Sequence, residues 1–576
     1  MLSTYTYPRY SSPRAAELDH PEKPHRRPVV VVGAGPVGLA AAIDLAQHGQ
    51  PVLLLDDDDT VSVGSRGLCY AKRALEVLDR LGVGDAVVAK GVTWNVGRTF
   101  HREQEVFNFN LLPEADHQRP GMVNLQQYYL EQYLVERAQQ LPQIELRWKH
   151  KVTRVEPLEQ GAVLHVESAE GHYTLQADWL VVADGARSPI RRMLGLDMEG
   201  KVFQDRFLIA DVVMKEPLFD EGKAERWFWF DPPFHPNQSV LLHREADNVW
   251  RIDFQLGWDA DPEEEKKPEN VIPRIQAMLG PKRSFDLEWV SVYTFQCRRM
   301  QSFRHGRVLF AGDAAHQVSP FGARGANSGI QDTDNLVWKL KLVMDGLAPE
   351  ALLDTYSSER VLAADENLMN STRSTDFITP KSQASRDFRN AVLTLAGQHA
   401  FARTLVNSGR LSVPAHLTTS SLNTPDRDAF EGQMHPGAPL ADAPVLHQGR
   451  EGWLLQHVGQ HLGGSFQLLL FVPTVESLGP EQLALIEQLA QRHAGRIAVP
   501  TLLVTERDGP APAGAKVLVD LRHRVAQRLD ASPGSAYLLR PDQHVAARWR
   551  LPTLADVRAA LARATAQTAE QSSATH

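Results

Sequence analysis

A glycine-rich turn early in the chain has the residue types and spacing that suit the binding of a dinucleotide. It reads GAGPVG from Gly33 to Gly38, after the valine run 29–32 and before an Ala- and Leu-rich helical pattern. Such glycines allow a tight turn and close backbone approach to a pyrophosphate, and the helix directs its positive dipole end at the anion. The next apolar run ends at Asp56, whose carboxylate is placed to accept from a ribose hydroxyl. We predict a βαβ dinucleotide site that includes Gly33, Gly35, Pro36, Gly38 and Asp56; the alternative is a glycine turn with a structural role only.

Two later segments place polar residues directly after an apolar run that has the length of a buried strand. Asp184 and Gly185 follow one run, and Gly312 and Asp313 follow another. In an open α/β sheet, ligands bind outside the carboxyl ends of the strands. We therefore expect both segments to contribute to the same site as the glycine turn.

The segment 320–327 reads PFGARGAN and combines two glycines with the expected start of a helix near Asn327. The glycines allow the backbone to approach a bound group closely, and the helix would direct its positive end toward that group. The alternative is an ordinary helix N-cap.

The glycine turn, the segment at Asp184-Gly185 and the segment at Gly312-Asp313 occur in the same order as in the FAD-dependent aromatic hydroxylases, which the chain therefore resembles. These are the single-component flavoprotein monooxygenases that include p-hydroxybenzoate and phenol hydroxylases. The segments SPFGARGANSGIQDTDNLVWKL and YSSERVLAADENLMNSTRSTDF are most similar to the 3-(3-hydroxyphenyl)propionate hydroxylase-like branch. The resemblance implies bound FAD and a transient electron donor, NADH or NADPH, with NADH favoured because this branch is catabolic. It implies hydroxylation of a phenol, either 3-hydroxyphenylpropionate-like or otherwise substituted, by dioxygen through a flavin C4a-hydroperoxide.

The resemblance also implies roles for individual residues. Asp313 matches the aspartate that holds the ribityl chain, Arg66 the arginine near the flavin pyrophosphate, and Gln127 the glutamine on the cofactor. Where the family has Ser-Arg-Ala, this chain has Ser65-Arg66-Gly67. The implied cofactor set beyond the glycine turn is Arg66, Gln127, Asp184, Gly185, Gly312, Asp313, Pro320, Gly325, Ala326 and Asn327.

A region of alternating apolar and polar residues, 200–300, predicts antiparallel strands with one buried face. Trp250, Ile252 and their i+2 neighbours alternate with Arg251 and Asp253, and we expect the apolar set to cover the substrate. We predict a pocket lined by Trp227, Trp229, Tyr293 and Phe321. Tyr293 and Pro320 are the candidate catalytic residues, although Tyr293 is equally typical of a plain core tyrosine.

The predicted architecture is α/β, with a Rossmann-like FAD-binding domain interleaved with an antiparallel substrate sheet and followed by a thioredoxin-like domain. Ser532-Pro533-Gly534 before an apolar run resembles the proline turn of thioredoxin-like extensions. No cysteine follows Cys297, so that domain has no redox dithiol. The expected boundaries are an N-terminal arm at 1–27, the FAD-binding domain at 28–200 and 301–400 with substrate-domain insertions near 91–115, the substrate sheet at 201–300, a linker at 401–440, the thioredoxin-like domain at 441–565 and a flexible tail at 566–576.

Composition restricts the class of protein further. The chain has 576 residues, 43% hydrophobic, with a net charge of −9, which is typical of a globular protein and argues against a nucleic-acid partner. Two cysteines give no disulfide framework, so we expect a cytoplasmic protein, and we expect no metal site. No apolar run reaches the ~20 residues of a membrane span.

The expected partners are a small aromatic substrate and dioxygen, with a homodimer possible. The rival functions are an FAD-dependent halogenase or dehydrogenase on the same fold, or a non-catalytic flavoprotein scaffold.

Overall fold

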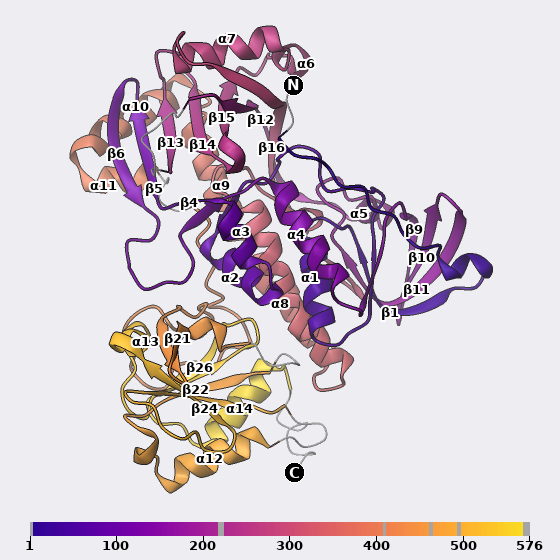
Figure 1. The fold of residues 1–576 in the computed structure, drawn as a ribbon, viewed down its shortest axis with the longest axis vertical. Helices are drawn as coiled ribbons and strands as arrows, with labels where there is room; N and C mark the ends of the chain where they lie inside the picture. The colour runs from indigo at the N-terminus through magenta and orange to yellow at the C-terminus, as the bar shows by residue number, and fades with distance from the viewer. Residues whose placement is uncertain (1–3, 217–223, 407–410, 460–464, 492–496, 568–576) are drawn as a thin grey trace.

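The computed structural model describes residues 4–216, 224–406, 411–459, 465–491 and 497–567, and the predicted tail from 568 onward lies outside them. Figure 1 shows three bodies: a sheet with α6 and α7 over it at the top, a second sheet with α1 and α8 in the middle, and a C-terminal sheet at the bottom. Within the described ranges, no helix is both long and apolar enough to cross a lipid bilayer.

The middle sheet contains a parallel core built from near-continuous runs of Val and Leu, which are typical of strands buried on both faces. Strands β18, β11, β1, β2 and β8 lie in that order and run parallel. The strands are β1 (His25–Val32), β2 (Val52–Leu55), β8 (Ile144–Arg147), β9 (Lys151–Leu158), β10 (Gly161–Ser168), β11 (Gly171–Val182), β17 (Arg304–His305) and β18 (Val308–Phe310). Because parallel strands end at one edge, the loops after β1, β11 and β18 meet there.

Helices cover this sheet and connect it to a small three-stranded sheet. The helices are α1 (Pro36–Gln47), α2 (Lys72–Leu81), α3 (Gly84–Lys90), α4 (Gln127–Gln139), α5 (Pro189–Met193), α8 (Gly325–Met344) and α9 (Leu352–Ile378). The small sheet consists of β3 (Cys69–Ala71), β7 (Met122–Asn124) and β4 (Val92–Trp94). Helix α8 packs against both α1 and α2, so it runs through the centre of the molecule.

The upper sheet has eight strands and is mixed rather than wholly antiparallel, because β13 and β5 run parallel. Its order is β19 (His316–Gln317), β16 (Phe285–Arg299), β12 (Glu199–Met214), β15 (Val249–Leu256), β14 (Ser239–Arg244), β13 (Glu225–Phe230), β5 (Val96–His101) and β6 (Gln104–Asn110). The helices α6 (Pro262–Glu265), α7 (Pro268–Leu279), α10 (Gln383–Gln398) and α11 (Ala400–Arg403) belong to the same body.

Both faces of this sheet are buried, which corrects the expectation of a single buried face. Trp250, Ile252 and Phe254 pack in one cluster with Val271 and Ile275 of α7, on the outer face. The alternate residues, which carry the charges, therefore face the side on which Phe321 packs and are buried as well. The expectation failed because alternation identifies two faces without showing which one a helix covers.

A β-bulge in β16 divides the residues that the sequence places on one parity. Asp211 pairs with Trp289 and Val212 with Leu287, so Glu288 is the extra residue. Since one added residue reverses the direction of every later side chain, Phe285 and Leu287 pack on the outer face while Tyr293 and Phe295 pack on the inner one.

The C-terminal domain is a seven-stranded sheet in the order β21-β20-β24-β23-β22-β25-β26. Strands β22, β23 and β24 run parallel, and β25 and β26 return antiparallel. The strands are β20 (Pro444–His447), β21 (Arg450–Trp453), β22 (Gln467–Phe471), β23 (Thr501–Thr505), β24 (Ala515–Asp520), β25 (Ala536–Leu539) and β26 (Val545–Trp549), and the helices are α12 (Pro480–Ala490), α13 (Arg524–Leu529) and α14 (Leu554–Ala564). Trp338 and Leu342 of α8 belong to its apolar core, so the domain docks on the central helix.

Candidate functional site

The predicted nucleotide turn lies where four neighbouring strands end. Gly33 follows β1, and its N–H donates to Leu55 O at the end of β2 (2.8 Å). Ala183 after β11 donates to Val32 O (2.8 Å), and Ala311 after β18 donates to Val182 O (3.0 Å). These bonds join the three polar loops into one edge, as expected for ligand binding at the carboxyl ends of parallel strands.

The three glycines of the turn differ in what a side chain would meet at each position. Gly33 has φ +106°, and a Cβ there would lie 2.3 Å from Ala183 O; a Cβ on Gly38 would lie 1.8 Å from Gly33 O. A Cβ on Gly35, by contrast, would meet no atom within 4 Å, and this glycine stands directly before α1. The first two glycines are therefore needed by the fold, whereas Gly35 leaves open space in front of a helix N-terminus.

Asp56 stands beside this turn and is part of its support. Its Oδ2 accepts from Ala34 N–H (2.5 Å) and its Oδ1 from Asp58 N–H (2.8 Å). Burial raises the pKa of the Asp56 carboxyl to about 6 despite these bonds. Each oxygen has a second lone pair, so the carboxylate retains capacity for a ribose hydroxyl.

The Gly-Asp segment after β18 is held from behind by a buried charge cluster. Gly312 has φ +62°, and its N–H donates to Asp332 Oδ2 of α8 (2.9 Å). The Asp332 carboxylate also bonds His316 Nε2 (2.6 Å) and Arg360 Nε (2.6 Å). Asp313 itself is exposed, yet the surrounding protein and Asp332 raise the pKa of its carboxyl. The cluster thus presents the Asp313 side chain toward open space.

The Asp-Gly segment after β11 is tied to the Gly-Asp loop. Asp184 Oδ2 accepts from Ile190 N–H at the start of α5 (3.1 Å). Arg191 donates to Ala314 O (2.7 Å), so the two loops are joined directly. Gly185 has φ +78° and open space around it, as expected of a loop beside a ligand.

Helix α8 begins at Gly325, two residues before the predicted start. The Asn327 side chain does not point into open space: its Oδ1 accepts from Ala71 N–H (2.8 Å) and its Nδ2 donates to Cys69 O (2.8 Å). It joins the first turn of α8 to β3. The N–H groups of the first turn, which include those of Gly325 and Ala326, have no acceptor inside the helix and are the donors available to a ligand.

Arg66 lies in an exposed position, and within the described part of the chain its guanidinium has no hydrogen-bond or ion-pair partner in the structure. Gln127 is fully engaged with the protein instead: its Oε1 accepts from Gly67 N–H (2.7 Å) and its Nε2 donates to Glu131 (2.7 Å). Gln127 therefore holds the loop that carries Arg66.

The predicted pocket residues separate onto two faces of the upper sheet. Phe321 is buried and contacts Phe207 and Phe295, with ring centroids 4.6 and 5.0 Å away. Tyr293 is half-buried in the same cluster. Pro320, which precedes Phe321 in the loop, is exposed. Trp227 and Trp229 do not join them, because they stack around Phe100 on the outer face. Their neighbours Phe228 and Phe230 take the inner face.

Sequence reasoning missed a buried charged row on the inner face. Strand pairing aligns Trp289, Asp211, Arg251 and His243 across β16, β12, β15 and β14. Arg251 forms two bonds with Asp211, each 2.8 Å long, and lies 3.3 Å from Glu245. The available signal was the alternation of these charges with Trp250 and Ile252, a pattern that by itself predicts a solvated face.

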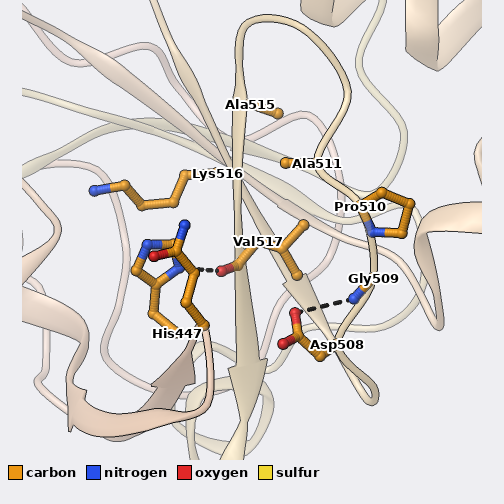
Figure 2. A pocket seen from close by; sticks show the side chains of 9 residues that line it. His447, Asp508, Gly509, Pro510, Ala511, Ala515, Lys516 and Val517 are labelled. Carbon is orange, nitrogen blue, oxygen red and sulfur yellow. Dashed lines mark hydrogen bonds between the residues drawn. The ribbon is translucent and has the colours of Figure 1, made fainter.

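A separate cavity of about 640 Å³ is lined by residues of the C-terminal domain (Figure 2). It is bordered by the edge of β24, where His447 Nδ1 bonds Val517 O (2.9 Å), and by the loop at Asp508 and Gly509. None of the predicted site residues lines it.

A family model described as an FAD binding domain matches residues 26–371, more than half of the chain. The chain belongs to the FAD-binding flavoprotein monooxygenases. It is an FAD-dependent aromatic monooxygenase, and the donors and open spaces at Gly35, Gly185, Asp313 and the first turn of α8 fit such a cofactor.

The monooxygenase is 29% identical over 557 residues to 6-methylpretetramide 4-monooxygenase from Streptomyces rimosus, covering 90% of each chain. It is 30% identical over 332 residues to a 3-(3-hydroxy-phenyl)propionate/3-hydroxycinnamic acid hydroxylase from Mycolicibacterium smegmatis, covering 58% of each chain. The solved structure of the flavin-dependent monooxygenase PieE, with FAD and substrate, superimposes with a TM-score of 0.79 over 95% of this chain and all of that one. The TM-score shows a shared fold, at a sequence identity of 23%.

Proposed function

We propose that this monooxygenase hydroxylates a phenolic ring, with FAD bound at the edge of the parallel sheet and NADH or NADPH as the reductant. One observation supports this proposal most directly. The flavin loop 320–327 places Phe321 among the inner-face aromatic residues of the upper sheet, while the first turn of α8 begins in the same loop. A flavin beside these N–H groups would therefore lie next to an aromatic compartment.

Each loop has a distinct task in holding the cofactor. Gly35 and the N-terminus of α1 would receive the pyrophosphate, Asp56 a ribose hydroxyl, and Asp313 the ribityl chain. The α8 N-terminus would stabilise negative charge on the pyrimidine edge of the ring. Bound FAD supplies the electron transfer and oxygen activation that amino-acid side chains do not provide.

The inner face of the upper sheet would orient the substrate and exclude water. Phe207, Phe295 and Phe321 give an apolar ring contact. Tyr293 packs against that cluster and carries a hydroxyl. Burial raises the pKa of this hydroxyl, whereas the positive charges of Arg251 and Arg66 lower it. Tyr293 is thus suited to accept or donate a hydrogen bond at the phenolic oxygen of a substrate and to help hold its proton.

Two substrate classes are worth testing. The resemblance of the flavin-loop segments favours a 3-hydroxyphenylpropionate-like phenol. The alignment over 90% of both chains with 6-methylpretetramide 4-monooxygenase favours a polycyclic phenol instead. We also propose that the C-terminal domain is thioredoxin-like, since β22, α12 and β23 followed by β25, β26 and α14 give that order of elements.

The deciding experiment uses purified FAD-loaded protein with NADH or NADPH under ¹⁸O₂. Substituted phenols, 3-(3-hydroxyphenyl)propionate and a polycyclic phenol are compared for nicotinamide oxidation and for labelled product. One ¹⁸O atom per product molecule supports the proposal and identifies the class. Substrate oxidation without oxygen incorporation would favour a dehydrogenase, and halide incorporation a halogenase. Absence of any turnover across the panel would contradict a phenol substrate.

A further inference from the structure

The loop 61–67, which carries Arg66, is bonded to α4 and to the upper sheet. Ser62 donates its N–H and its hydroxyl to Glu131 of α4 (2.5 and 2.8 Å). Arg251 of the upper sheet donates to Ser65 O. Together with the bond from Gly67 to Gln127, these contacts fix the loop on both sides of Arg66. The Arg66 side chain is exposed and makes no hydrogen bond or ion pair among the described residues.

One more contact to this loop comes from the N-terminal arm. The N–H of Gly64 donates to Tyr7 Oη (3.0 Å). Gly64 has φ +76°, and a Cβ there would lie 2.5 Å from the Trp289 ring. The glycine is therefore enclosed between Tyr7 and the upper sheet, two residues before Arg66.

The arm is itself anchored on both sides of Tyr7. Thr4 N–H donates to Glu288 (3.0 Å), the extra residue of the β16 bulge, and Tyr5 stacks on Tyr128 of α4 with ring centroids 4.2 Å apart. Beyond Tyr7, Tyr10 N–H donates to Asp59 O (2.8 Å). The arm thus spans from the upper sheet to the loop after β2, and Tyr7 stands at the middle of that span.

We infer that Tyr7 is a positioning residue that holds Arg66 in its flavin-facing place. The inference rests on the proposed function in placing FAD at this edge, and on the family resemblance in assigning the Arg66 side chain to FAD. The Arg66 side chain is exposed, and the hydrogen bond from the loop to the arm is the bond from Gly64 to Tyr7. Removing the Tyr7 hydroxyl should loosen the loop at Gly64, next to Arg66, while the other tethers and the fold remain.

The test compares Tyr7→Phe with Tyr5→Phe. Both variants keep the ring and lose one hydroxyl of the arm, but the Tyr5 hydroxyl bonds Gln132 (2.9 Å) on α4 rather than the loop. Hydrogen–deuterium exchange of the peptide that contains Gly64 is measured in apoprotein, together with the FAD dissociation constant of each protein. One neutral hydrogen bond corresponds to about a fivefold change in an opening equilibrium. We expect about fivefold faster exchange at Gly64 and a rise of up to fivefold in the FAD dissociation constant for Tyr7→Phe, and no change in either for Tyr5→Phe.

A double-mutant cycle with Arg66→Ala separates positioning from a general structural effect. If Tyr7 acts through Arg66, Tyr7→Phe should leave the FAD dissociation constant unchanged once Arg66 is alanine. Unchanged exchange at Gly64 in Tyr7→Phe would overturn the positioning role of Tyr7 and leave the proposed function intact. Faster exchange with unaltered FAD binding in both Tyr7→Phe and Arg66→Ala would instead overturn the assignment of Arg66 to FAD, and with it the positioning role.

Discussion

The C-terminal domain is joined to the central helices by a buried ionic cluster, and the substitution Arg540→Met tests what that cluster does. Arg540 donates to both carboxylate oxygens of Glu359 on α9 (2.7 and 2.9 Å) and to Asp542 (3.0 and 2.6 Å). Lys339 of α8 donates to the same Glu359 (2.7 Å). All four side chains are at most 1% exposed.

The charges in this cluster are balanced, two cations against two carboxylates. Arg540→Met leaves Lys339 as the cation that faces the carboxylates of Glu359 and Asp542, beside the neutral donor Asn335 on Glu359 and the imidazole of His544, 3.3 Å from Asp542 Oδ1. Because removing one partner of a buried pair leaves a charge uncompensated, the free energy of unfolding should fall by about 3–5 kcal/mol. The double variant Arg540→Met/Glu359→Gln restores the balance, so it should be more stable than Arg540→Met although it carries one more substitution.

Chemical denaturation of the apoprotein, followed by tryptophan fluorescence, measures these differences. Arg522→Met is the matched control, since Arg522 pairs with Asp116 but its side chain is 73% exposed, and an exposed pair contributes at most about 1 kcal/mol. The reasoning is refuted if Arg540→Met costs no more than the control, or if the double variant is less stable than the single one. The first result would mean that apolar packing alone docks the domain.

Three further predictions concern the flavin site and the upper sheet. Gly38→Ala should prevent stable folding, because its Cβ would lie 1.8 Å from a backbone oxygen. Gly35→Ala should keep the melting temperature of the apoprotein and lower FAD affinity at least tenfold. Equal effects of the two substitutions on melting temperature and FAD affinity would contradict the separate roles of the two glycines. Burial lowers the pKa of His243 to about 4. Below pH 6.5 the unfolded chain therefore binds a proton that the native protein does not, and the free energy of unfolding falls as the pH falls from about 6.5 to about 4. His243→Gln should remove about 3 kcal/mol of this pH dependence, measured by denaturation curves at several pH values. Tyr293→Phe should lower kcat/KM at least tenfold in steady-state assays, while Trp229→Phe on the outer face should leave it within twofold; the reverse order would place the substrate on the other face.

Much of the edge where we propose that FAD binds could be predicted from the sequence, because its determinants are local. A strand, a glycine turn and a helix follow one another within 25–47, and a strand, the Gly-Asp segment and α8 follow one another within 308–344. Parallel strands then bring these loops to one edge without further information. The exceptions involve side-chain partners that lie far away in sequence. Asn327 and Gln127 have the positions expected of cofactor ligands, yet each bonds backbone groups of β3 or of the Arg66 loop.

The upper sheet was harder to predict because its faces depend on one unpaired residue and on a helix that follows the strand. Period-two alternation identifies the two faces of β15, but only α7 decides that the Trp250 face is the outer one. In β16 the extra residue Glu288 reverses the alternation, so Leu287 and Tyr293 share a parity and not a face. The same bulge exposes Glu288 to Thr4 of the arm. The β-bulge at Glu288, which the sequence pattern does not predict, therefore has two effects. It turns Tyr293 toward the flavin loop, and it anchors the arm that reaches Gly64.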